Sequence, residues 1–170
     1  LDYFFKYSTL LGDGFVVFTA ALILTLFRLR LALLTFLTFA LSGIFVQIVK
    51  HIASVPRPKA YFPADVLSFI EGVKVYSTNS FPSGHTATAF AFFLMLSLFV
   101  KNKSWGILFF FIAVSAAFSR IYLLQHFFMD TYFGSITGVL FSVFIFYFFR
   151  NNEKLRESKI LSKPVWKLWK

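Results

Sequence analysis

The chain has 170 residues, of which 58% are hydrophobic and 27 are phenylalanine, and its formal net charge is +10. This composition excludes a soluble domain, because so few polar side chains cannot cover the surface of a protein of this size in water. The absence of cysteine excludes disulfides, thiolate chemistry and cysteine-based metal sites.

Apolar segments of about 18 or more residues follow one another along the chain, each long enough to cross a bilayer as a helix. The five segments are residues 10–27, 31–49, 83–100, 104–123 and 127–149. We therefore expect an all-α, polytopic transmembrane helix bundle in residues 1–150, followed by a basic cytoplasmic tail in residues 151–170. The chain begins with Leu1 and shows no signal peptide, so five spans with a cytoplasmic C-terminus suggest a further helix upstream in the native protein.

The basic residues are distributed unevenly between the two sides of the predicted bundle. Eleven of the 17 lie in the short connections after the first and third spans or in the segment from Arg150 to the C-terminus. The positive-inside rule places these segments in the cytoplasm. The positive charge therefore indicates topology and contact with anionic lipid headgroups, and it does not predict nucleic-acid binding.

The longest connection, residues 56–82, lies on the opposite, outer side. It contains several prolines and a short mixed segment, and we expect an ordered loop or lid at the level of the headgroups. Tyr61, Phe62 and Phe69 are its candidate interfacial anchors. The alternative is an unstructured connector.

Nearly all the unusual residues fall at three outer edges of the spans, "KHIASVPRP" (50–58), "PSGHTATAF" (82–90) and "SRIYLLQHFFMD" (119–130). Ser83 and Gly84 begin a helix, whose free N–H groups and dipole favour an anion, and His85 follows in the first turn. His126 and Asp130 are four residues apart, which places them on one face of a helix.

Three cations, Lys50, Arg57 and Arg120, complete these edges, and a cluster of this kind suits a phosphate dianion. Each residue has an ordinary interpretation when taken alone. Lys50 could extend its ammonium group to the interface, Arg120 could be an interfacial anchor, and Asp130 could be an acid in a first helical turn. Ionisable groups that converge at membrane spans nevertheless indicate a functional site. His51 is expected to be structural or exposed.

The three edges resemble the signature of the type 2 phosphatidic acid phosphatase superfamily, K-x6-R-P, P-S-G-H and S-R-x5-H-x3-D. Every fixed position and internal spacing of the signature is present between residues 50 and 130. The family usually has six membrane helices, one more than the sequence predicts here. The superfamily includes membrane lipid phosphatases, glucose-6-phosphatases and soluble vanadium haloperoxidases, and a short apolar chain fits the first group best.

The resemblance implies a phosphatase that needs no metal or other cofactor and forms a phosphohistidine intermediate. His126 would be the nucleophile, Asp130 its orienting partner, and His85 the general acid and base. Phosphate binding would fall to the remaining signature residues, Lys50, Arg57, Ser83, Gly84 and Arg120.

The expected function is hydrolysis of a lipid phosphomonoester or diphosphate at the outer face of a bacterial plasma (inner) membrane. Candidate substrates are undecaprenyl diphosphate, phosphatidylglycerol phosphate, phosphatidic acid and a lipid A phosphate, and the sequence does not rank them. The alternatives are a vanadate-dependent haloperoxidase and a non-catalytic lipid-phosphate binder or transporter. The expected partners are the lipid substrate and the bilayer, and the sequence predicts no oligomeric state.

Overall fold

The structure, a computed structural model, describes residues 1–167, and the regular elements within them are all helical. In chain order these are α1 (Asp2–Ser8), η1 (Thr9–Gly12), α2 (Gly14–Thr25), α3 (Leu29–Ala53), α4 (Pro58–Tyr61), α5 (Gly84–Phe99), α6 (Ser104–Tyr122), α7 (Phe128–Asn151), α8 (Glu153–Arg156) and η2 (Val165–Lys167). The expected all-helical bundle is confirmed, and each predicted span falls mainly on one of the helices α2, α3, α5, α6 and α7.

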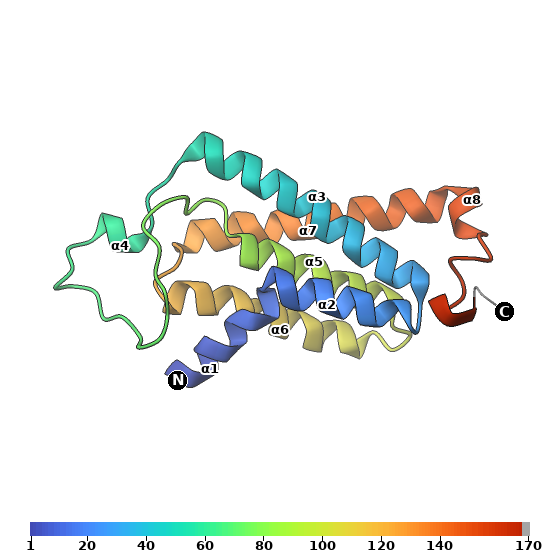
Figure 1. The fold of residues 1–170 in the computed structure, drawn as a ribbon, viewed down its shortest axis with the longest axis horizontal. Coiled ribbons are helices and arrows are strands. Elements are labelled where there is room, and N and C mark those ends of the chain that lie inside the picture. Colours follow the sequence, from blue (N-terminus) through green and yellow to red (C-terminus); the bar gives the residue numbers. More distant parts are fainter. Residues whose placement is uncertain (168–170) are drawn as a thin grey trace.

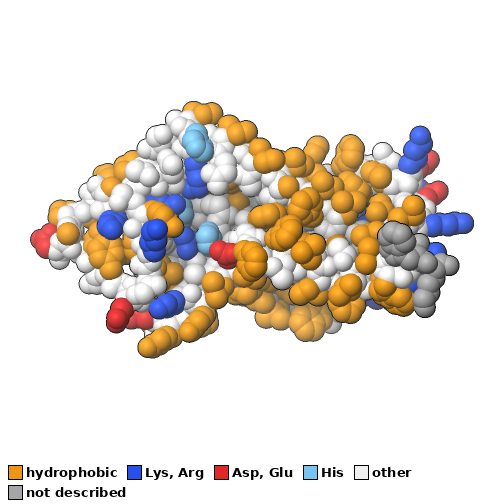
Figure 2. All heavy atoms as spheres, in the orientation of Figure 1, with side chains coloured by type: hydrophobic (Ala, Val, Ile, Leu, Met, Phe, Trp, Pro, Cys, Tyr) orange, Lys and Arg blue, Asp and Glu red, His pale blue; other side chains and the backbone are white. Residues whose placement is uncertain are grey.

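Helix α5 lies in the middle of the bundle, where α3, α6 and α7 pack around it (Figure 1). Its face toward α6 is built from small and aromatic side chains, and Met95 joins it to α3 and α7 in a second apolar cluster. Figure 2 shows hydrophobic side chains over much of the visible flank of the bundle. Large apolar side chains that face outward in this way suit a lipid environment.

The lengths of the helices correct the predicted spans at two places. Helices α6 and α7, and α3 together with α4, are long and apolar enough to cross a membrane. The first predicted span is broken instead, because α1 with η1 meets α2 at an angle of 55° and the two together make one candidate span. The third predicted span, 83–100, forms α5 with only 16 residues, which is short for a full crossing.

Glycines on α7 allow a close crossing with α5. A Cβ atom at Gly134 would lie 2.6 Å from the Ser83 carbonyl oxygen, and one at Gly138 would overlap the Ala87 carbonyl. Small residues let helix backbones approach in this way within membranes. The approach brings the starts of the two helices together, and the Ser83 N–H donates to the Asp130 carbonyl at 2.9 Å.

The two ends of the bundle carry different connections (Figure 1). The loop end carries residues 54–83, including α4, and the short turn between α6 and α7. The tail end carries the connections after α2 and α5 and residues 152–167, which contact the bundle: Arg30 donates to the Arg156 carbonyl at 2.6 Å. Within the long loop, Tyr61, Phe62 and Phe69 are exposed, as interfacial anchors would be.

Candidate active site

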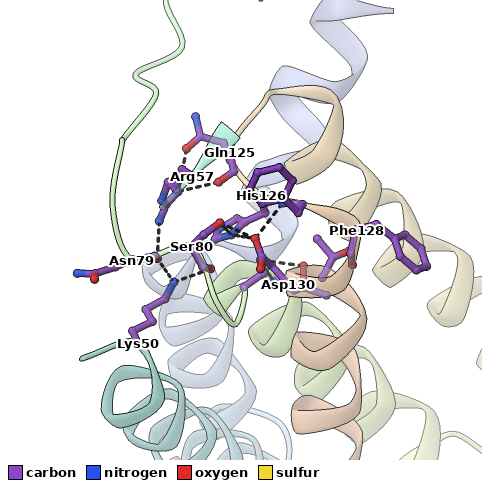
Figure 3. A network of polar contacts seen from close by, with 12 residues as sticks. Lys50, Arg57, Asn79, Ser80, Gln125, His126, Phe128 and Asp130 are labelled. Atoms are coloured by element: carbon purple, nitrogen blue, oxygen red, sulfur yellow. Dashed lines mark hydrogen bonds and ion pairs between the residues drawn. The ribbon is translucent and has the colours of Figure 1, made fainter. Parts of the chain in front are cut away.

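A network of polar contacts occupies the loop end, where α3, the long loop, the start of α5 and the α6–α7 connection meet (Figure 3). Basic and histidine side chains also gather on this end in the space-filling view (Figure 2). The network therefore joins segments that lie far apart in the sequence.

His126 and Asp130 form the centre of this network. The Nδ1 atom of His126 lies 3.4 Å from Oδ2 of Asp130, and both side chains are buried. The sequence predicted that the two residues share one helix, and this is wrong: His126 precedes α7, and Asp130 lies in the first turn of α7. Asp130 is fixed there because its Oδ2 also accepts from the Phe127 N–H at 2.8 Å.

Ser80 is the third member of the centre and was missed by the sequence reasoning. Its fully buried hydroxyl donates to Oδ2 of Asp130 and lies 3.4 Å from Nδ1 of His126. Serine and aspartate thus both face the same ring nitrogen of His126. Within residues 1–167, Nε2 of His126 has no hydrogen-bond partner, so that nitrogen is left for a ligand.

Burial lowers the pKa of His126 well below its ordinary value, and the positive charges of Arg57, Arg120 and Lys50 act in the same direction. The hydrogen bond with Asp130 opposes this effect but does not outweigh it. The imidazole is therefore neutral at pH 7, with a lone pair on one nitrogen.

Lys50 and Arg57 approach the centre from the end of α3 and from the loop. Lys50 is buried and donates to the carbonyls of Asn79 and Ser80, at 2.6 and 3.2 Å. Arg57 donates through all three of its guanidinium nitrogens. Its acceptors are the carbonyl of Thr78 (2.8 Å), the carbonyl and side-chain oxygens of Gln125 (3.1 and 3.2 Å) and the carbonyl of Asn79 (3.4 Å).

Arg120, at the end of α6, is the third cation; it is buried like Lys50, whereas Arg57 is half-buried. Its Nη1 donates to the Thr9 hydroxyl at 2.6 Å, whereas its buried Nε has no hydrogen-bond partner in residues 1–167. Its carbonyl oxygen accepts from the His126 N–H at 3.1 Å, which ties α6 to the centre of the network.

None of these three cations lies within 4.0 Å of a carboxylate in the described part of the chain. Buried charges without a counterion are costly, and carbonyl dipoles offset only part of that cost. The cluster is therefore suited to bind an anion, and the unpartnered Nε of Arg120 offers it a donor.

The start of α5 supplies the remaining predicted residues. Ser83 is the N-cap, as expected, and its buried hydroxyl accepts from the Thr86 N–H at 3.4 Å. A Cβ atom on Gly84 would make only an ordinary contact, 3.6 Å from Val46, so helix packing does not require glycine there. His85 lies beside Asp13, with 3.6 Å between Nε2 and Oδ2.

The structure thus joins the predicted residues at one end of the bundle and adds others that the motifs do not contain. His51 lies outside the network, exposed and bonded to the Gln47 carbonyl of its own helix. The described residues contain no group of three or more histidine and acidic side chains placed to hold a metal ion. The additions are Thr9, Asp13, Asn79, Ser80 and Gln125.

The family profile of the PAP2 superfamily matches residues 31–154. The chain belongs to the PAP2 superfamily. The match includes the whole network except the contacts from the first 30 residues. Together with the apolar helical bundle, it supports an integral membrane protein.

Two known proteins are similar to this PAP2 chain. The "Bacitracin transport permease protein BcrC" of Bacillus licheniformis is 32% identical over 111 residues, 65% of this chain and 52% of that protein. The chain thus spans about half the length of this curated relative. The crystal structure of Aquifex aeolicus LpxE is 29% identical, with a TM-score of 0.72 over 86% of this chain and 85% of that one.

Proposed function

We propose that this protein is a metal-independent lipid phosphatase that hydrolyses a phosphomonoester or diphosphate through a phosphohistidine at His126. The observation that carries the proposal is the set of three cations without carboxylate partners, two buried and one half-buried, beside the buried His126–Asp130 pair. A binding site needs the cations, but the paired His126 and Asp130 add a nucleophile and the group that orients it.

In the first step, Nε2 of His126 attacks the phosphorus, the P–N bond forms, and the bond from phosphorus to the lipid oxygen breaks. Asp130 holds Nδ1 and stabilises the positive ring. His85 gives its proton to the departing oxygen and then takes a proton from water. That water attacks the phosphorus, releases phosphate and restores His126.

Lys50, Arg57 and Arg120 hold the non-bridging phosphoryl oxygens and offset the charge that spreads over them in the transition state. Ser83 and the N–H of Gly84 add donors at the start of α5. When substrate binds, only local hydrogen bonds have to change. Lys50 and Arg57, which now donate to loop carbonyls of residues 78–80, would donate to a phosphoryl oxygen instead.

The substrate is an amphiphile whose tail remains among the exposed apolar side chains of the bundle. Undecaprenyl diphosphate, phosphatidylglycerol phosphate, phosphatidic acid and a lipid A phosphate all present a phosphoryl group next to an apolar tail. The basic tail end lies in the cytoplasm by the positive-inside rule, so the loop end faces the outer side of a bacterial plasma membrane.

The test is release of phosphate by the purified protein in detergent with EDTA, over a panel of these lipids. We expect release that survives EDTA and is abolished in His126→Ala. After denaturation during turnover of a ³²P-labelled lipid, the wild-type protein should carry a label that is stable to base and lost in acid, as a phosphohistidine is. His51→Ala is the matched control, because His51 is an exposed histidine outside the network. Release by His126→Ala would refute the mechanism.

The Bacillus relative is named a transport permease, so a second candidate for this chain is transport or binding without turnover, with a lipid phosphate as the ligand we would test. The same panel decides this case. Saturable binding of a radiolabelled lipid phosphate by both wild type and His126→Ala, with no phosphate released by either, would favour it over hydrolysis.

A further inference from the structure

The break in the first span lies against the active site. Residues Thr9–Gly12 form η1 between α1 and α2, and they pack on both α5 and α6 (Figure 1). The sequence places most of this stretch in the first membrane span, away from the site. In the structure, Thr9 and Asp13 reach the signature residues Arg120 and His85.

Asp13, the residue that follows η1, uses its two carboxylate oxygens for different contacts. Oδ1 accepts from the N–H groups of Phe15 and Val16, at 2.9 and 3.4 Å, and so caps the start of α2. Oδ2 lies 3.6 Å from Nε2 of His85, an ion-pair distance. The cap therefore holds the carboxylate in a fixed orientation, with its free oxygen toward the imidazole.

Two further contacts keep the break in this place. A Cβ atom on Gly12 would overlap the carbonyl oxygen of His85, so the two backbones are in direct contact. Thr9 accepts the hydrogen bond from Arg120 at 2.6 Å. Asp13 thus approaches His85 on a segment that is anchored to α5 and α6 at separate points.

We propose that Asp13 is the positioning residue of His85, so that the broken first helix completes the acid–base half of the active site. The proposal rests on the proposed function, since it assigns a partner to the group that protonates the leaving oxygen. Each histidine then has an aspartate that orients it: Asp130 contacts Nδ1 of His126, and Asp13 contacts Nε2 of His85.

The contact also assigns the two ring nitrogens of His85. With Nε2 directed toward Asp13, Nδ1 is the nitrogen that gives a proton to the departing lipid oxygen and later takes one from water. A carboxylate beside Nε2 keeps a proton on that nitrogen and stabilises the imidazolium. No proton has to pass to Asp13 in either step.

Asp13→Asn separates this role from the structural one. Asparagine caps a helix as well as aspartate, so the variant keeps the cap of α2 and loses only the negative charge beside His85. Asp2→Asn is the matched control, because Asp2 lies on the same N-terminal segment and its carboxylate binds the Tyr122 hydroxyl of α6 at 2.6 Å. Thermal unfolding in detergent establishes that both variants are folded.

The readout compares two leaving groups. On a lipid phosphate, whose alkoxide must be protonated as it leaves, Asp13→Asn should lower kcat by about tenfold to a hundredfold, part of the effect of general acid catalysis. On p-nitrophenyl phosphate, the leaving phenolate needs no proton, so the first-turnover burst should stay within about threefold of wild type. Asp2→Asn should change neither quantity.

Equal losses on both substrates would show a purely structural role and overturn the proposal, and so would a full rate on the lipid phosphate. A second measurement uses His85→Asn as background: Asp13→Asn should then cause no further loss, whereas an additive loss would contradict action through His85. Failure of the proposed function is a distinct result, because it leaves the wild-type protein without an activity that depends on His126.

Discussion

Replacement of Ser80 by alanine tests how the centre of the active site is held. The change removes one hydroxyl group that donates to Asp130 and leaves the Ser80 carbonyl, an acceptor for Lys50, in place. A hydrogen bond to a charged group contributes about 1.5–3 kcal/mol. Because this bond is present in the resting protein, its loss should lower the free energy of unfolding by about that amount.

The same loss should reach the reaction, since Asp130 then keeps only the Phe127 N–H beside its contact with His126. Only the part of this energy that is gained in the transition state lowers kcat. The fall in kcat should therefore be smaller than about 10- to 150-fold, the change to which the full 1.5–3 kcal/mol would correspond at about 1.4 kcal/mol per factor of ten.

The assay for Ser80→Ala is phosphate release from a lipid phosphate in detergent, measured together with unfolding of the same preparation. Ser97→Ala is the control, because its hydroxyl donates only to the Leu94 carbonyl of its own helix, far from the site. If Ser80→Ala matched Ser97→Ala in both stability and kcat, the bond to Asp130 would have no energetic role and the reasoning would be wrong.

Gly84→Ala should fold normally, because the added Cβ atom makes only an ordinary contact. Its kcat/KM should fall about tenfold or more, because the methyl group crowds the phosphoryl site. Gly106→Ala on α6 is the control, and equal activity of the two variants would contradict this prediction. Because burial lowers the pKa of His126, unfolding takes up a proton at acidic pH, so the free energy of unfolding should fall below pH ~6.5, by up to about 1.4 kcal/mol per pH unit. Denaturation curves of His126→Asn should lack that part of the slope, and an unchanged slope would oppose the assignment. Arg57→Lys keeps the charge but not the planar fork, so kcat/KM should fall at least about tenfold while Lys59→Arg has no such effect; steady-state kinetics of the two variants decide the point.

The helices could be predicted from the sequence because long apolar runs leave few other structures possible in a membrane. The break between α1 and α2 could not, since the run from Leu10 to Phe27 is nearly continuous in hydrophobicity. What divides it is tertiary: Gly12 meets the backbone of α5, and Asp13 caps α2.

The site was predictable where a motif fixes both the residue and its spacing, as for His126 and Asp130. It was not predictable where a contact joins segments that are distant in the sequence. Ser80 contacts residues about 50 positions away, and its place two residues before Pro82 marks it only by proximity to a motif. The prediction that His126 and Asp130 lie on the same helix was wrong, because α7 begins only at Phe128. A residue in the preceding loop can reach a carboxylate in the first helical turn as well as a residue within the helix can.

The shortness of α5 sets the depth at which this protein can act. Helix α3 has 25 residues and α5 has 16, a difference of about 13 Å at 1.5 Å per residue. A Cβ atom on Gly84 would lie 3.6 Å from Val46, which is seven residues before the end of α3, so the start of α5 lies recessed beneath the end of α3. A lipid whose phosphate is joined directly to the apolar tail presents this phosphate at the depth of the start of α5. A lipid with a long, hydrated spacer between tail and phosphate presents the phosphate farther out, in the water. Under the proposed function, this recess favours lipids whose phosphate lies close to the apolar tail, in addition to the selection by charge.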